Sequence, residues 1–292
     1  MPLICLAALA VGLLAVPTTA PTSAASAGPA AVPLRVMSFN VRYGHADDGD
    51  DRWEARRDLL IETIRGFAPD LLGTQEVLAH QRDHLRAALA EHALVGVGRE
   101  DGKEKGEFAA ILYRPDRFEL LDSGTYWLSH EPTKVASVGW DAALTRIMTW
   151  AKLRDRRDGR ALLFVNTHWD HRGERARLES AKLMRRLVRQ IGDLPTIVTG
   201  DFNCTEADAP YGELVGDSLI DTYRALHPRP EPDAATFHGF KGGTNGGRID
   251  WILCSPSFAV RDASIDHSSR DGRYPSDHYP ITAIVEGVNP LR

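Results

Sequence analysis

The sequence is poor in cysteine, with only three among its 292 residues. Their positions, Cys5, Cys204 and Cys254, do not have the close spacing of a zinc site. If the N-terminal segment is removed, Cys204 and Cys254 remain. They could form a disulfide in an oxidising compartment, or stay as two buried free thiols. The sequence leaves both alternatives open.

The chain also lacks a strong charge of either sign, since its formal net charge is -5. This balance gives no general electrostatic reason to bind nucleic acid or an anionic membrane. It disfavours a nonspecific nuclease, although a local basic groove stays open. Hydrophobic residues make up 43% of the chain and charged residues 26%, which is ordinary for a globular protein of enzyme size.

Long hydrophobic runs are missing except near the N-terminus, at Leu3–Val16, and this run is too short to span a bilayer comfortably. A stretch of small residues and prolines follows, with Ala25-Ser26-Ala27 as a possible cleavage signature, although basic residues before the run are missing. We expect residues 1–31 to be a signal peptide and low-complexity linker. The protein is then secreted or extracytoplasmic, without stable membrane insertion, and residues 32–292 form a single domain.

From Arg35 onwards, strand and helix patterns alternate. Apolar spacing predicts helices over 54–67, 77–90 and 174–191. Runs of alternating or continuous apolar residues predict strands over 34–39, 70–73, 108–113, 118–127, 146–153, 162–167, 196–199, 249–253, 258–265 and 281–285. No internal repeat or second domain boundary is visible. Consecutive strands between helices favour an α/β fold of layered sheets with helices outside.

Short polar motifs lie at the ends of these strands. They include Asn40, Gln75-Glu76, Asn166-Thr167-His168, Gly200-Asp201-Phe202-Asn203, Arg248-Ile249-Asp250-Trp251 and Ser276-Asp277-His278. Hard oxygen ligands without cysteine suit Mg²⁺, Mn²⁺ or Ca²⁺. The two histidines add groups that can donate a proton near neutral pH. This set of side chains fits metal-assisted attack of water on a phosphoester.

In this order, the motifs from Ser38-Phe39-Asn40 to Ser276-Asp277-His278 resemble the endonuclease/exonuclease/phosphatase (DNase I-like) superfamily. The resemblance covers Arg35 to Val285 and looks closest to a secreted bacterial branch related to CCR4/nocturnin-type enzymes. It implies a four-layer α/β/β/α sandwich with the site at one mouth of the paired sheets.

The resemblance also implies a metal site and a water-activating group. Glu76 would be the principal carboxylate for Mg²⁺ or Mn²⁺, with Asn40 and Asp277 beside it, directly or through water. Asp201 would orient or deprotonate the attacking water. Asn203 would hold the phosphate or that aspartate.

The remaining catalytic roles fall to two histidines and an aspartate. His278 would contact the phosphoryl oxygens, positioned by Asp250, and His168 would stabilise developing charge or assist the leaving group.

Substrate contacts are predicted on the strand and loops nearby. Arg146 resembles a phosphate-contacting arginine, because a guanidinium suits phosphate. Trp140 and Trp169 could stack on a sugar or a base, with Asp170 beside them in the substrate site. Trp150 and Trp251 are expected in the core.

We therefore expect an exported monomeric phosphoesterase that depends on a divalent metal. Its substrate would be a small or glycan-linked phosphomonoester or phosphodiester. A DNA or RNA nuclease stays open as an alternative and predicts a basic groove and steep salt dependence. A repurposed hydrolase, for example of glycosidic bonds, or a non-catalytic binding module on the same fold stay open as well.

Overall fold

The computed structural model describes residues 32–216, 218–229 and 234–288. The predicted signal peptide and linker at residues 1–31 therefore lie outside the described residues. Those that are described belong to one compact unit, Ala31–Arg292. Within this part of the chain, no helix combines the length and apolar character needed to cross a membrane.

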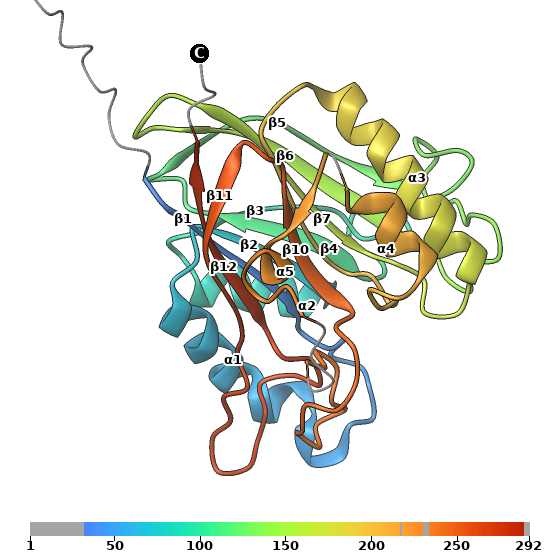
Figure 1. Ribbon diagram of the computed structural model, residues 1–292. Helices are drawn as coiled ribbons and strands as arrows, with labels where there is room; N and C mark the ends of the chain where they lie inside the picture. The colour runs from blue at the N-terminus through green and yellow to red at the C-terminus, as the bar shows by residue number, and fades with distance from the viewer. Residues whose placement is uncertain (1–31, 217, 230–233, 289–292) are drawn as a thin grey trace, which may run out of the picture. The chain divides into compact units, whose positions relative to one another are not determined.

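The described residues form two six-stranded sheets (Figure 1). The first has the order β11 (Phe258–Ile265), β12 (Ile281–Gly287), β1 (Leu34–Asn40), β2 (Leu71–Val77), β4 (Phe108–Tyr113) and β3 (Ala93–Val95). The second has the order β5 (Phe118–Trp127), β6 (Ile147–Asp155), β7 (Ala161–His168), β8 (Thr196–Asp201), β10 (Asp250–Cys254) and β9 (Ile220–Asp221).

Helices cover the outer faces of both sheets (Figure 1). The first sheet carries α1 (Trp53–Phe67) and α2 (Ala79–Ala88), and the second carries α3 (Glu174–Ile191) and α4 (Ala209–Leu214). A short 3-10 helix (Gly49–Asp51) and α5 (Thr222–Leu226) complete the set. The predicted α/β/β/α sandwich is confirmed.

Alternation along the strands separates the core into layers. Val36 of β1 and Ile197 of β8 lie in the cluster between the two sheets. Their neighbours face outwards: Met37 packs under α1 and α2, and Val198 packs under α3. Because successive strand residues point to opposite faces, near-continuous apolar runs supply both the central core and an outer one.

A buried polar contact joins the two sheets. Asn166 Nδ2 of β7 donates to the carbonyl oxygens of Thr74 (2.8 Å) and Ala110 (3.0 Å), and its Oδ1 accepts from Gln75 Nε2 at 2.7 Å. The sheets can approach here because residue 73 is glycine, whose missing Cβ would lie 2.6 Å from Asn166 Oδ1. Asn166 therefore fixes one sheet against the other.

Strand pairing brings the polar motifs to one end of the sandwich. β1 and β2 are parallel and pair Asn40 with Gln75, while parallel β7 and β8 pair His168 with Asp201. Antiparallel β10 begins opposite the same aspartate, with Asp250 paired to Asp201. Residues from distant parts of the sequence therefore meet at one mouth of the paired sheets.

The two cysteines within the described residues are free and buried, so the alternative of two thiols holds. Burial raises the pKa of both Cys204 and Cys254 to about 12, which keeps them protonated and unreactive at neutral pH.

Candidate active site

The centre of the site is a cluster of Glu76, Asp201 and His278, whose ligand atoms all lie within 4.8 Å of one another. Glu76 lies in β2 with φ of 63°, a left-handed conformation that is uncommon for glutamate and marks a constrained position. Asp201 ends β8, and His278 lies in the loop before β12. Three separate elements thus supply this cluster.

Asn40, at the end of β1, lies between the two carboxylates. Its Nδ2 donates to Glu76 Oε1 at 3.0 Å and to Asp201 Oδ2 at 2.9 Å. Its Oδ1 accepts from the backbone N–H of Arg42 at 2.9 Å. We predicted Asn40 beside the metal, directly or through water, and the structure places its amide NH₂ against the two carboxylates of the cluster.

His278 is paired with Asp250 through Nδ1 and Oδ2 at 2.9 Å, as predicted for these two residues. Its Nε2 lies 3.7 Å from Asp201 Oδ2. Burial by itself would lower the pKa of His278, but the carboxylates of Asp250 and Asp201 raise it well above its ordinary value. His278 is therefore a cation near neutral pH.

The neighbours of Asp201 favour its uncharged form, because it is buried close to other acids. Burial and the nearby Asp250 raise the pKa of Asp201 to about 7, although His278 opposes this shift. A carboxyl group with such a pKa can exchange a proton near neutral pH.

His168 and Asn203 form a second pair beside Asp201. Asn203 Nδ2 donates to the carbonyl of Trp169 at 3.0 Å, which fixes the orientation of the amide, and lies 2.9 Å from His168 Nε2. His168 Nε2 is thus the acceptor, and the ring proton belongs on Nδ1. Burial and the Arg146 charge lower the pKa of His168 well below its ordinary value, so the ring is neutral.

Arg146 reaches the same place from the residue before β6. Its side chain is buried, and among the described residues its Nη1 has no hydrogen-bond partner. Its Nη2 lies 3.0 Å from His171 Nδ1, and its Nε lies 3.5 Å from Asp170 Oδ2. An unpartnered buried guanidinium nitrogen is costly unless a ligand supplies an acceptor.

These side chains surround a pocket of about 390 Å³. Its lining contains Arg42, Tyr43, Glu76, Glu107, Leu144, Arg146, His168, His171, Asp201, Asn203, Phe237, Ile249, Asp277 and His278.

Residues 37–278 match the model of the Endonuclease/Exonuclease/phosphatase family. The chain belongs to this family. An endonuclease/exonuclease/phosphatase family protein from Bacteroides thetaiotaomicron superposes with a TM-score of 0.83 and is 35% identical, covering 89% of this chain and 99% of that one.

Two further proteins are similar over most of this chain. The mannosyl-6-phosphatase of Bacteroides thetaiotaomicron VPI-5482 is 35% identical, with a TM-score of 0.77 and coverage of 86% of this chain and 99% of that chain. The nocturnin of Mus musculus is 25% identical over 283 residues, which cover 85% of this chain and 63% of that protein. The chain thus spans less than two thirds of the length of this nocturnin.

The central cluster of this family member fits a divalent cation. Asp201 and Asp277 are buried, and burial raises the pKa of both, so several acids crowd one small volume. A divalent cation would relieve their repulsion. The Glu76 carboxylate would hold the cation as the hard oxygen ligand that Mg²⁺ and Mn²⁺ prefer, while Asp201 and the cationic His278 lie in the same cluster beside it.

Asp277 lies in the pocket but outside the three-residue cluster. Its Oδ2 lies 3.5 Å from Arg42 Nη1, and its Oδ1 accepts from Ser276 Oγ at 3.3 Å. Of the two acidic residues predicted at the metal, Glu76 and Asp277, it is Glu76 whose carboxylate joins the compact cluster. Asp201 and His278, predicted as catalytic groups, take the other two positions.

Asp170 corrects our prediction of a substrate contact. Its side chain is buried and accepts from the backbone N–H groups of Gly173 (2.7 Å) and Arg172 (3.0 Å). Burial opposes the charge, but these backbone hydrogen bonds lower the pKa of Asp170 to about 2. The aspartate stays ionised and holds the loop and Arg146.

Trp169 also corrects the prediction. Its exposed fraction is 0%, and its indole N–H donates to Met184 Sδ at 3.1 Å, so it cannot stack on a substrate. Trp140 lies outside the pocket lining, against His130 in a separate cavity. Trp150 and Trp251 are buried, as expected.

The pocket side chains that sequence reasoning missed include Arg42, Tyr43, Glu107, Leu144 and Phe237. Glu107 accepts from Arg99 Nη1 at 2.7 Å and lies 3.7 Å from His168 Nδ1. In the sequence, Glu107 follows a stretch rich in glycine and charged residues, where a glutamate is typical of a solvent-exposed turn. No local pattern shows that Glu107 is turned into the site.

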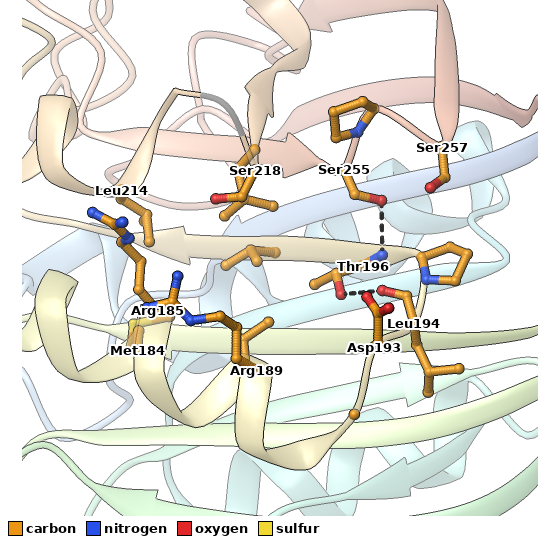
Figure 2. A pocket seen from close by; sticks show the side chains of 16 residues that line it. Met184, Arg185, Arg189, Asp193, Leu194, Thr196, Leu214, Ser218, Ser255 and Ser257 are labelled. Carbon is orange, nitrogen blue, oxygen red and sulfur yellow. Dashed lines mark hydrogen bonds between the residues drawn. The ribbon is translucent and has the colours of Figure 1, made fainter. Parts of the chain in front are cut away.

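A larger cavity of about 660 Å³ lies at the other end of β8 (Figure 2). It is lined near Thr196, the first residue of β8, whereas Asp201 is the last. Arg185 and Arg189 of α3 border it. It contains none of the predicted site residues, so its size does not make it the active site.

Proposed function

We propose that this protein is a phosphatase that uses a divalent metal to release phosphate from a sugar phosphomonoester. The observation that carries the proposal is the unpartnered Nη1 of buried Arg146, which lines the same pocket as Glu76, Asp201 and His278. A phosphoryl group offers the acceptor that this guanidinium lacks.

Different groups in the pocket would have different roles in such a hydrolysis. A bound divalent cation would supply positive charge for the phosphoryl oxygens and acidify water. Asp201, in the same cluster, would orient the attacking water or take its proton. The cationic His278, held by Asp250, can donate to a phosphoryl oxygen.

His168, Leu144 and Phe237, which also line the pocket, suit the leaving group. His168 Nδ1 is buried and has no hydrogen-bond partner among the described residues, so its N–H can donate to a substrate oxygen. Leu144 and Phe237 are 41% and 50% exposed at the pocket rim. An exposed aromatic side chain beside the catalytic groups suits the apolar face of a sugar ring.

The similarity to a mannosyl-6-phosphatase supports a sugar phosphate over a nucleic acid. The net charge of -5 also gives a polyanion no general attraction. We further propose that the protein is exported, on the strength of the apolar run Leu3–Val16 alone.

A substrate panel tests the proposal. Phosphate release should be measured with mannose 6-phosphate, other hexose phosphates, a chromogenic phosphodiester, RNA and single-stranded DNA, each with Mg²⁺, Mn²⁺ or EDTA. We expect release from a hexose phosphate that EDTA abolishes. Glu76→Gln should reduce kcat at least ~10²-fold because it removes a carboxylate from the cluster.

Glu54→Gln is the matched control, since Glu54 is exposed on α1 outside the pocket. Efficient cleavage of RNA or DNA, steeply weakened by salt, with no action on sugar phosphates would instead identify a nuclease. Full activity of Glu76→Gln would refute the metal assignment.

A further inference from the structure

A groove of about 510 Å³ runs along α3, outside the active-site pocket. Trp140 and His130 line one wall, and Arg175, Arg186 and Gln190 line the helical wall. None of these residues lines the active-site pocket.

The groove begins beside the active site and leads away from it. Arg175 is the second residue of α3 and follows closely on the Asp170–Gly173 turn that holds Arg146. Gln190 is the last but one. At 1.5 Å per residue, the helical wall from Arg175 to Gln190 extends for roughly 22 Å.

One loop connects this groove to the pocket. Trp140 lines the groove, and Leu144 of the same loop lines the pocket. The loop is pinned at two points: Asp141 Oδ1 accepts from Ala176 N at 2.6 Å, and Leu144 N donates to Asp170 Oδ2 at 3.2 Å. The two cavities are therefore neighbours along one loop whose position is fixed.

Trp140 is partly buried and packs against the core under α3, yet it also lines the groove. Its φ is 52°, a genuine outlier for a bulky side chain, and such strain persists where the surroundings enforce it. Its ring lies 5.0 Å from that of His130. Among the described residues its indole N–H has no acceptor, whereas the indoles of Trp127 and Trp251 donate to backbone carbonyls.

The polar side chains of the groove are mixed in charge. Arg175, Arg186 and Gln190 are exposed, and their side chains make no hydrogen bond within the described part of the chain. Glu179 also lines the groove and pairs with Lys182 at 2.9 Å. Donors and acceptors around an aromatic face suit the hydroxyl groups and apolar face of a sugar, and the two arginines that lack a hydrogen bond in this part of the chain also suit a sugar that carries phosphate.

We propose that this groove binds the glycan chain of the substrate, so that the enzyme removes phosphate from an oligosaccharide whose terminal phosphosugar enters the pocket. The inference rests on the proposed phosphatase activity and narrows its substrate from a free to a chain-linked sugar phosphate. Trp140 is then a specificity-determining residue that contacts a sugar outside the reacting centre.

The test compares two substrates that carry the same hexose phosphate, one free and one at the end of a tetrasaccharide. For Trp140→Ala we expect kcat/KM on the tetrasaccharide to fall roughly tenfold, the loss expected from one aromatic contact, with no change on the free hexose phosphate. The double variant Arg186→Ala/Gln190→Ala should act in the same direction without touching the core.

Arg189→Ala is the matched control, because Arg189 is exposed on the same helix but borders the cavity of Figure 2. It should leave both substrates unaffected. Calorimetry with the phosphate-free tetrasaccharide gives a second readout: we expect binding by the unaltered protein and its loss in Trp140→Ala.

Equal losses on both substrates, or no effect of either groove variant, would overturn the inference and leave the phosphatase intact. A loss confined to RNA cleavage would show that the groove serves nucleic acid. Binding of the tetrasaccharide without release of phosphate from either substrate would refute the proposed function but not the glycan groove.

Discussion

At the scale of the residue, the surroundings decide what each acid and histidine can do. His278 and His168 have the same side chain, yet His278 faces Asp250 and is a cation, while His168 lies near Arg146 and is neutral. Asp201 shows the same effect, because burial among acids brings its pKa to about 7. The pocket thus contains a cationic donor, a neutral donor and a base, built from two residue types.

Asp250→Asn tests this division. The substitution keeps the shape of the side chain but removes the charge that holds His278 protonated, so we expect kcat to fall roughly 10²-fold. The measurement is metal-dependent phosphate release, with circular dichroism to confirm an unchanged fold. Asp262→Asn, at an exposed position of β11, is the control and should have wild-type activity. Unchanged turnover of Asp250→Asn would contradict the role of the pair.

At the scale of the element, strand β7 does two separate tasks. Its last residue, His168, lines the pocket, while Asn166 bonds to β2 and β4 of the other sheet. The motif Asn166-Thr167-His168 therefore combines a structural residue with a site residue. Asn166 and His168 are two residues apart, so their side chains share one face of the strand. They differ in role because His168 is the last residue of the strand and lines the pocket.

Asn166→Leu should destabilise the protein by about 3 kcal/mol, because it leaves buried polar groups of Thr74, Ala110 and Gln75 without a partner. Urea unfolding followed by tryptophan fluorescence measures the loss. Arg154→Leu, at an exposed position of β6, is the comparison and should change stability little. A loss below about 1 kcal/mol would mean that water replaces the lost bonds.

At the scale of the whole molecule, a buried ion-pair network holds the sheets together at the end opposite the site. Arg117 Nη1 lies 2.6 Å from Asp70 Oδ2, next to β2, and Nη2 lies 2.9 Å from Asp155 Oδ2, at the end of β6. Arg117 also donates to the backbone carbonyl of Pro33. One guanidinium thus links the two sheets and the start of the described chain.

Arg117→Met should lower the free energy of unfolding by about 3–5 kcal/mol, since it leaves two buried carboxylates without their cationic partner. Adding Asp70→Asn and Asp155→Asn should recover part of this loss, because the charges that lack a partner are then gone. Chemical denaturation of the single and triple variants provides the comparison. A triple variant less stable than the single one would show that the carboxylates have other essential partners.

The family, the α/β/β/α layers and most of the pocket followed from the sequence, because strands with apolar runs end in short polar motifs that the chain carries in a fixed order. Glu76, Asp201, Asn203 and His278 do line the pocket, and Asp250 pairs with His278, while their catalytic roles stay predictions. The pattern failed where orientation matters: Trp169 is in the core, and Asp170 holds Arg146.

The sequence by itself determined which groups of the chain can do chemistry, since residue types and their places at strand ends are local properties. The tertiary structure alone decided which of them face one another. Glu107 comes close to His168 from a loop that is distant in sequence. Trp140 and Trp169 were both predicted to contact the substrate, but Trp140 lines a groove and Trp169 is buried in the core. The physical reason is that burial and charge depend on neighbours brought together by sheet pairing, which no stretch of sequence contains.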